Sequence, residues 1–208
     1  MTCIAGLVDH HGAVWIGGDS AGTDNFGLQT IHEDKKVFLL NPPDQPDYRK
    51  ESPTLLVGGT GSFRFRDLLQ YTLEVPPYDP AMSMRKYLVT AFVDAVRTCL
   101  KSAGYDKKQE GEEQGGEVLI GWHGRLFHMQ EDYQISEASI RYDATGAGTG
   151  IALGTLFATQ HLGLSPEERV KLALEAAAYH CDSVRPPFLI MRLERGNEPL
   201  STTVLARV

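Results

Sequence analysis

The feature that most restricts the fold is the first stretch of the chain, which has the pattern of a β-hairpin. Residues 4–8 are apolar, residues 9–12 (DHHG) have the composition of a turn, and residues 13–16 are apolar again. The second strand ends at two glycines, and Asp19 follows them. Because a hairpin reverses the chain, the sequence predicts that Asp19 returns to the neighbourhood of Thr2, where the first strand begins.

Thr2 is itself a candidate nucleophile. Cells commonly remove an initiator methionine that precedes a small residue, and removal of Met1 would leave Thr2 with a hydroxyl and a free α-amine. The hydroxyl then serves as nucleophile and the amine as its proton acceptor. An α-amine has a pKa of about 7.7–8.0, so a fair fraction is unprotonated at neutral pH. We therefore expect the mature chain to begin at Thr2.

Composition limits the classes of function. The length of 208 residues suits one domain over residues 1–208, and 42% hydrophobic and 23% charged residues are ordinary for a globular protein. A net charge of −7 argues against nucleic acid and anionic membranes as partners. Neither a membrane span nor a signal peptide is expected. The three cysteines lack metal or disulfide spacing, which favours a cytoplasmic protein.

The remaining pattern alternates short strands with helices. Residues 89–100 have the clearest helical period, and Ser165 begins a capping box for a helix that follows it. Residues 107–116 are charged and rich in glycine, which predicts a solvated loop. The order of strands, two helices, strands, two helices and strands favours two sheets with helices outside them. The other predicted elements are strands at 36–40, 54–57, 188–193 and 202–206, a helix at 63–73, and a hairpin at 118–129.

Short motifs lie at residues 2–4 (TCI), 17–20 (GGDS), 35–37 (KKV), 57–60 (VGGT) and, more loosely, 146–150 (GAGTG). In the order of these motifs, the chain resembles the proteasome β-subunit and HslV-type peptidases, which are N-terminal-nucleophile hydrolases. The resemblance implies an α+β fold, the four-layer αββα sandwich of this family. It also implies a threonine-type endopeptidase with Thr2 as nucleophile.

The same resemblance implies the other site residues. Lys36 is the second lysine of a Lys-Lys pair before an apolar residue, the position of the family's catalytic lysine, and Asp19 would pair with it. Lys35 would lie on the opposite face of the strand, because side chains alternate. The backbone amide of Gly58 would point at the oxyanion, and Thr60 would form a wall of the specificity pocket.

One spacing leaves a rival nucleophile open. From Thr2 to Asp19 the chain is one residue longer than in the family, whereas the spacing from Cys3 to Asp19 matches. Cysteine is an established nucleophile, but Cys3 would require removal of both Met1 and Thr2. An extra residue in the turn at 9–12 explains the spacing more simply, so Cys3 ranks second.

Later positions also depart from the family pattern. Ala147 stands where the family has a serine between two glycines, and Thr149 is a candidate substitute for the lost hydroxyl. Asp182 aligns with a later family aspartate, but Arg185 follows where a serine is usual. These losses make a slow, specialised or inactive enzyme conceivable.

The leading hypothesis is a peptidase that cleaves peptides or unfolded proteins inside a homo-oligomeric ring or related assembly, with an ATP-dependent unfoldase as a candidate partner. The alternatives are a small-amide hydrolase of the same fold and a non-catalytic scaffold subunit. The scaffold type usually carries an extension before the first strand, which is not seen in this sequence. No cofactor or metal is expected, because residues 146–150 lack the Walker lysine and the adjacent His10 and His11 point apart.

Overall fold

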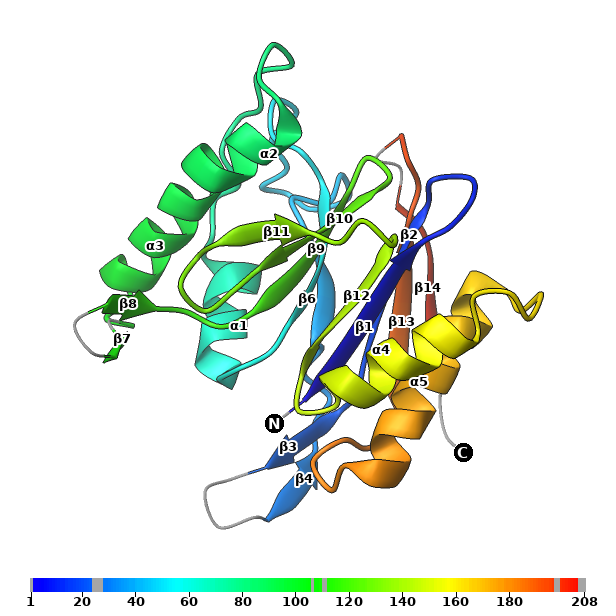
Figure 1. Ribbon diagram of the computed structural model, residues 1–208. Coiled ribbons are helices and arrows are strands. Elements are labelled where there is room, and N and C mark those ends of the chain that lie inside the picture. Colours follow the sequence, from blue (N-terminus) through cyan, green and yellow to red (C-terminus); the bar gives the residue numbers. More distant parts are fainter. Residues whose placement is uncertain (1, 24–27, 106, 110–111, 197–198, 206–208) are drawn as a thin grey trace.

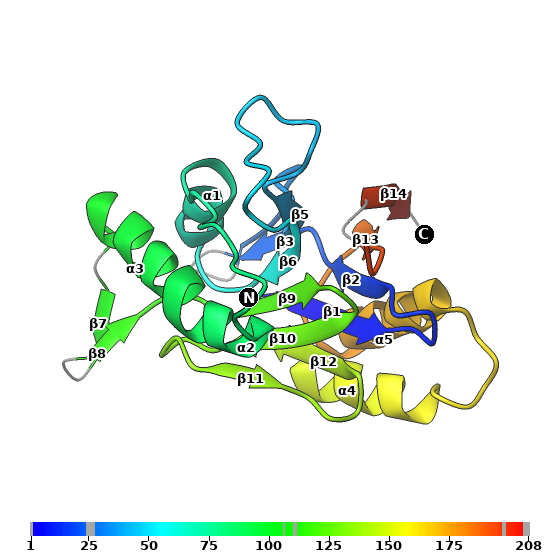
Figure 2. The ribbon, with the colours of Figure 1, turned by 90° about the horizontal axis from the view of Figure 1, so that it is seen from above.

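The structure, a computed structural model, describes residues 2–23, 28–105, 107–109, 112–196 and 199–205. Two antiparallel sheets face each other, and helices cover both outer faces (Figures 1 and 2). This is the predicted four-layer αββα arrangement. Met1 lies outside the described residues, so its predicted removal stays a prediction.

The first sheet contains the predicted N-terminal hairpin at its centre. Asp9 organises the turn, because its carboxylate accepts hydrogen bonds from the backbone N–H groups of His11 and Ala13, both at 2.9 Å. The indole of Trp15 donates a third hydrogen bond to the same carboxylate, at 3.0 Å. In spatial order the strands are β12 (Tyr142–Gly146), β1 (Cys3–Val8), β2 (Val14–Gly18), β13 (Phe188–Leu193) and β14 (Pro199–Leu205). The predicted strand at 202–206 is thus part of β14, and Ala206 lies outside the described residues.

The second sheet contains the other predicted hairpin. His123 and Gly124 form its turn with φ of 46° and 76°, the left-handed values that two-residue hairpin turns require. In spatial order the strands are β11 (Ile135–Glu137), β10 (Arg125–Met129), β9 (Val118–Trp122), β6 (Leu55–Gly59) and β5 (Val37–Leu40).

The helices divide between the two outer faces. Helices α1 (Phe63–Tyr71), α2 (Met84–Tyr87) and α3 (Val93–Ser102) lie outside the second sheet, and α4 (Thr149–Ala158) and α5 (Pro166–His180) lie outside the first (Figure 2). Ser62 caps α1, and the capping box predicted at Ser165 is present at the start of α5. Both caps lie at the starts of helices that the sequence predicted, α1 and α5.

The helical face predicted at residues 89–100 is wrong at its first position. A π-helical turn, η1 (Leu88–Phe92), joins α2 to α3. Because a π turn inserts an extra residue, it rotates the chain before it relative to the chain after it. Tyr87 and Leu88 therefore face the core, and Val89 is 47% exposed.

Three apolar clusters fill the spaces between the four layers. Successive side chains of β1 point to opposite faces of the sheet, so they belong to different clusters. Ile4 and Val8 pack between the two sheets, while Cys3, Ala5 and Leu7 pack against α4 and α5. Every residue of β1 is buried, because both faces of its sheet are covered.

Two small hairpins lie outside the main sheets. One pairs β3 (Ala21–Thr23) with β4 (Gln29–Ile31), directly after Asp19. The other pairs β7 (Lys107–Gln109) with β8 (Glu112–Gln114), so the loop predicted at residues 107–116 is partly strand. Within the described part of the chain, no helix has the length and apolarity to cross a membrane.

Candidate active site

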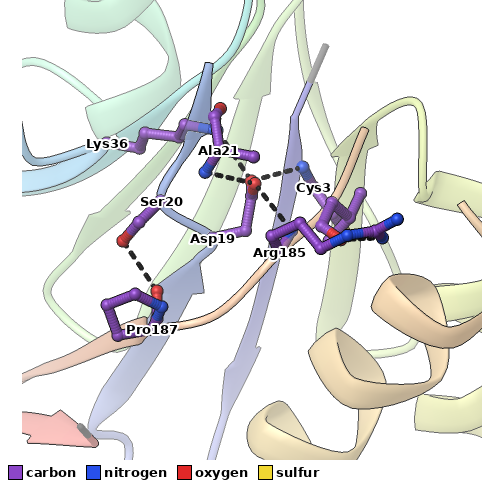
Figure 3. Close-up of polar contacts among 8 residues, drawn as sticks. Cys3, Asp19, Ser20, Ala21, Lys36, Arg185 and Pro187 are labelled. Atoms are coloured by element: carbon purple, nitrogen blue, oxygen red, sulfur yellow. Dashed lines mark hydrogen bonds and ion pairs between the residues drawn. The ribbon is translucent and has the colours of Figure 1, made fainter. Parts of the chain in front are cut away.

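A buried ion pair forms the centre of the candidate site. Asp19 follows the last residue of β2, and Lys36 precedes the first residue of β5, so the two sheets bring the residues together. The Nζ atom of Lys36 lies 2.8 Å from Oδ1 of Asp19, and the two side chains are 1% and 0% exposed. Lys36 also donates a hydrogen bond of 2.6 Å to the carbonyl oxygen of Ala21 (Figure 3). Lys36 is thus the buried member of the Lys-Lys pair, and Lys35 is exposed.

The Asp19 carboxylate receives several further hydrogen bonds. The backbone N–H groups of Cys3 and Ala21 each donate to it at 3.0 Å, and that of Arg185 donates at 3.4 Å. Figure 3 shows Lys36 and Ala21 on one side of this carboxylate and Cys3 and Arg185 on the other. A buried carboxylate is costly unless it is paired and hydrogen-bonded, and this one is both. The position of Lys36 is therefore well determined.

Burial changes the acidity of Lys36. Loss of solvent lowers the pKa of its ammonium below the usual value, because the charged form is the one that water stabilises. The attraction of Asp19 opposes this shift, and the positive charge of Arg66 adds to it. The ammonium is therefore held in place by Asp19 while being easier to deprotonate than an exposed lysine.

Thr2 and Cys3 occupy different surroundings. The thiol of Cys3 faces α5, since a Cβ on Gly148 would lie 2.8 Å both from Sγ of Cys3 and from Cβ of Ala177. The alternation of β1, continued by one residue, assigns the Thr2 side chain to the face of Ile4, between the sheets. The sheet containing Lys36 borders that space.

The Cys3 thiol is harder to deprotonate than an exposed cysteine. Burial raises the pKa of its thiol to about 12, and the negative charge of Asp19 adds to the effect. A thiol is nucleophilic as its thiolate, so these surroundings make Cys3 inert at neutral pH.

Gly58 has a packing role that the sequence did not predict. It is paired on both sides of β6, opposite Val37 of β5 and Leu119 of β9. A Cβ at Gly58 would lie only 2.6 Å from Cγ2 of Ile4, so glycine here allows the two sheets to approach closely. Its expected role at the oxyanion stays a prediction.

Thr60 lies close to the beginning of β1. A Cβ on Gly146 would be 2.2 Å from the carbonyl oxygen of Thr2 and 3.1 Å from Cγ2 of Thr60, so the two threonines flank this glycine. The N–H of Thr60 donates a 2.9 Å hydrogen bond to the carbonyl of Glu117. Thr60 and the backbone of Thr2 therefore lie against the same glycine, and the role of Thr60 as a pocket wall stays a prediction.

The segment after β12 supplies fewer polar groups than the family pattern. The hydroxyl of Thr149 donates a hydrogen bond to the carbonyl of Gly146 at the start of α4, so it serves the local backbone. Ala147 provides its carbonyl to the thiol of Cys181 at 3.7 Å. Asp182 is not part of the buried cluster, because its carboxylate is fully exposed and lies 3.6 Å from Arg185.

Three polar residues near this site were given no role in the sequence analysis. Arg185 contributes its N–H to Asp19, and its guanidinium donates to three carbonyls near the end of α5. Glu117 accepts a hydrogen bond from the hydroxyl of Thr145, the residue paired with Ile4. Arg66 is buried on α1. Of these three residues, only Arg66 has a mark in the sequence, because it is a charged residue that lies between the apolar positions of the helix predicted at residues 63–73.

A cleft of about 820 Å³ opens beside the ion pair. Its lining includes Ser20, Ile31, His32, Lys36 and residues 186–189. Ser20 donates a hydrogen bond of 2.7 Å to the carbonyl of Pro187, which joins the two sides of the cleft (Figure 3). Among the residues that the structure describes, no three His, Cys, Asp or Glu side chains are placed to hold a metal ion.

Comparisons with known proteins find similar structures but no similar sequences. No protein-family model matches the sequence, and no curated protein is similar to it at a significant level. Solved structures do match. BPH from Thiobacillus denitrificans has a TM-score of 0.72 and 22% identity, with 93% of this chain and 98% of that chain covered.

Two further structures agree over nearly the whole chain. A Gly-1 mutant of Anbu from Hyphomicrobium sp. strain MC1 has a TM-score of 0.71 and 13% identity, covering 99% of this chain and 87% of that one. HslV from Trypanosoma brucei has a TM-score of 0.63 and 12% identity, covering 93% and 99%. The predicted fold is confirmed: this chain has the fold of the proteasome β-type N-terminal-nucleophile hydrolases.

Proposed function

We propose that this protein is a threonine-type peptidase that hydrolyses amide bonds with Thr2 as its nucleophile, after removal of Met1. The observation that carries the proposal is the buried pair of Lys36 and Asp19, held where β1 begins. A buried ion pair is often no more stabilising than apolar packing of the same volume, so stability alone does not explain why this pair is present. A catalytic role next to Thr2 explains it.

In the proposed reaction, the α-amine of Thr2 accepts the hydroxyl proton as Oγ1 attacks the scissile carbonyl carbon. The tetrahedral intermediate collapses to an ester of Thr2, and the ammonium returns the proton to the leaving amine. Water then attacks the ester and gives a proton to the α-amine. As the acid is released, the resulting ammonium returns that proton to Oγ1, which restores the hydroxyl and the neutral amine. The positive charge of Lys36 favours the alkoxide and, by repulsion, lowers the proton affinity of the α-amine.

The surroundings of the two candidate nucleophiles favour Thr2 over Cys3. Cys3 donates its backbone N–H to Asp19 while its thiol packs against α5, with a pKa raised to about 12. Thr2 lies next to Thr60, the proposed pocket wall. The mechanism does not use Asp182, because its carboxylate is exposed.

The proposed substrates are peptides or unfolded proteins, processed in a homo-oligomeric assembly in the cytoplasm. Large apolar side chains on the outer surface of the α4–α5 layer support an interface there, since Phe157 is 64% and Tyr179 86% exposed. Native mass spectrometry checks this part of the proposal. A monomer that hydrolyses only small amides would favour the alternative hydrolase.

The nucleophile is tested with three proteins: the wild type, Thr2→Ala and Cys3→Ala. A panel of fluorogenic peptides should be cleaved by the wild type, cleaved at background rate by Thr2→Ala, and cleaved within about threefold of wild type by Cys3→Ala. Intact mass should show that active material begins at Thr2. Full activity in protein that retains Met1 would contradict the mechanism, because the amine would then be part of a peptide bond.

A second readout uses a known ligand of a structural relative. BPH from Thiobacillus denitrificans has been solved in complex with epoxomicin. We expect epoxomicin to bind this protein at Thr2 and to protect it from thermal unfolding, and Thr2→Ala to weaken that protection. Equal protection of the wild type and Thr2→Ala would place the compound elsewhere.

A further inference from the structure

The carboxylate of Glu117 is a charged group near the candidate site that the proposed mechanism does not use. Glu117 directly precedes β9 and is partly buried. Its carboxylate accepts a hydrogen bond from the hydroxyl of Thr145 on β12, a residue that is 1% exposed. Among the residues that the structure describes, no lysine, arginine or histidine is bonded to this carboxylate. Burial makes an unpaired charge costly, so an ammonium group next to Glu117 would be favourable.

The pairing of β12 with β1 places this carboxylate near Thr2. Thr145 is opposite Ile4 in that pair, and Ile4 packs between the two sheets, so the Thr145 side chain points into the same space. Thr2 precedes Ile4 by two residues and therefore points to the same face. Diagonal neighbours such as Thr145 and Thr2 lie about 7–8 Å apart, a distance that a long side chain can span. Glu117, which is bonded to Thr145, is therefore within reach of Thr2.

Thr60 brings Glu117 to the same place from the second sheet. The N–H of Thr60 donates a hydrogen bond of 2.9 Å to the Glu117 carbonyl, and its hydroxyl donates a longer one of 3.5 Å to the same oxygen. Cγ2 of Thr60 and the carbonyl of Thr2 both lie against Gly146. Gly146 directly follows Thr145 in β12. Contacts from β12 and from the end of β6 thus agree that Glu117 lies where β1 begins.

The other charged groups near the start of β1 are engaged elsewhere. Asp19 and Lys36 form an ion pair with each other, and the guanidinium of Arg185 donates to three backbone carbonyls. The carboxylate of Asp182 is exposed. Glu117 is therefore the acid best placed to accept a hydrogen bond from an amine at Thr2.

Hydroxyl groups do not take this role. Ala147, the residue that an extended β12 would place opposite Thr2, has no hydroxyl. Thr149 donates its hydroxyl to the carbonyl of Gly146 at the start of α4. The base of the proposed mechanism, the Thr2 amine, is therefore left with Glu117 as its polar neighbour on the β12 side.

We propose that Glu117 is a positioning residue that holds the α-amine of mature Thr2 and stabilises the ammonium formed when this amine takes the hydroxyl proton. The inference rests on the proposed function, because the amine exists only after removal of Met1. The aspartate of a Ser-His-Asp triad acts in the same way on its histidine, which it orients and stabilises in the charged form. Glu117 stays ionised throughout, since the proton moves from Oγ1 to the amine and from there to the leaving group.

The first test uses Glu117→Gln, which removes the charge but keeps the size of the side chain and an oxygen for the Thr145 hydroxyl. Its kcat should fall about 10- to 100-fold on a peptide that the wild type cleaves, while KM stays within about threefold, because the lost interaction strengthens in the transition state. Glu117→Asp keeps the charge and should recover part of the rate. The control is Glu131→Gln, an exposed glutamate whose carbonyl is bonded to Gly115, and it should keep the wild-type rate.

The pH profile separates an effect of charge from a structural one. A carboxylate beside the amine favours the protonated form, so the midpoint at which kcat/KM rises with pH should move down by about one pH unit in Glu117→Gln. The remaining titratable groups around this position are the thiols of Cys3 and Cys181 and the guanidinium of Arg66, and the variant leaves all three in place. An unchanged kcat or an unshifted midpoint would overturn the inference, because Glu117 would then serve only to fasten β12 through Thr145.

Competitive acetylation of the α-amine is a readout that does not depend on turnover. Protein whose intact mass begins at Thr2 is labelled with acetic anhydride at a series of pH values, and mass mapping of the first peptide gives the pKa of the amine. This pKa should be lower by about one unit in Glu117→Gln than in the wild type. If Glu117→Gln does not fold, Thr145→Val, which removes the hydroxyl that holds the carboxylate, serves in its place and should shift the pKa in the same direction.

The two proposals can fail separately. If no peptide is cleaved but the pKa of the amine falls in Glu117→Gln, the proposed function fails and the assignment of Glu117 to the amine stands. If peptides are cleaved and neither this pKa nor kcat changes in Glu117→Gln, the proposed function stands and the inference fails.

Discussion

Lys36 and Arg66 are two buried cations whose charges repel each other, and the fold treats them differently. Lys36 has a carboxylate at 2.8 Å and a carbonyl at 2.6 Å, whereas Nε and Nη1 of Arg66 have no hydrogen-bond partner among the described residues. A cation that is hydrogen-bonded within the protein serves to place charge at a fixed point. A buried cation with unpaired donors lowers the stability of the fold. The difference teaches that burial alone does not mark a catalytic residue, since the bonding of the charge decides its role.

The largest effect should come from breaking the bonded pair. Lys36→Met leaves the Asp19 carboxylate buried without its cation, which should destabilise the protein by about 3 kcal/mol, at the lower end for such pairs because backbone donors remain. Turnover should fall by more than about a thousandfold, with a smaller change in KM. Chemical denaturation and steady-state kinetics measure both, with exposed Lys35→Met as the control. If Lys35→Met were the inactive variant, the assignment of the catalytic lysine would be wrong by one residue.

The second prediction removes the negative partner. In Asp19→Asn, burial and Arg66 still lower the pKa of Lys36, and the opposing attraction is gone, so this pKa falls further. A lysine whose folded pKa is below its unfolded value binds fewer protons when folded. The loss of folding free energy caused by this lysine is present in full at pH values below its folded pKa. It disappears as the pH rises toward the unfolded pKa of about 10.4.

The free energy of unfolding of Asp19→Asn should therefore rise with pH in the window between those two pKa values. The total rise should be larger than in the wild type, because the pH window between the folded and unfolded pKa values is wider, and urea titrations at a series of pH values measure it. Lys36→Met combined with Asp19→Asn is the control and should lack this component. A free energy that falls with pH across the same window would contradict the direction of the shift.

Arg66→Met should have a smaller effect of opposite sign. Methionine keeps much of the apolar stem that packs on Gly59 and removes a buried charge with unpaired donors. Replacing poorly compensated buried charge by apolar atoms is commonly stabilising, here by about 1–2 kcal/mol. Urea unfolding of Arg66→Met beside Lys36→Met tests the contrast directly. Equal destabilisation of the two variants would mean that Arg66 is satisfied within the fold.

The smallest effect concerns the thiols. Because Cys3 is fully buried and its pKa is about 12, iodoacetamide at pH 8 should leave it unlabelled in the native protein. The partly exposed Cys181 should react first. Peptide mass mapping after brief labelling distinguishes them, and labelling in urea is the control. Rapid labelling of Cys3 would reopen its candidacy as nucleophile.

Local signals in the sequence predicted much of this protein. The hairpin over residues 4–16, the capping box at Ser165 and the turn at His123 depend on residues a few positions apart, so pattern and turn chemistry suffice to find them. The motif order also paired Asp19 with Lys36, and the structure places them in contact. The order of strands and helices favoured two sheets with helices outside them, and the resemblance to the proteasome-type family implied the four layers.

Only the tertiary structure decided which side chains meet and which are buried. It placed the Cys3 thiol against α5, left the Asp182 carboxylate in solvent, and buried two nitrogens of Arg66 with no hydrogen-bond partner in the described part of the chain. It also exposed Val89 through a π turn that no residue pattern marked. Desolvation and pairing of charges depend on segments far apart in the chain, such as the end of β2, the start of β5 and the first turns of α1. A sequence determines the elements through near neighbours, whereas the environment of each charge exists only once the layers have packed.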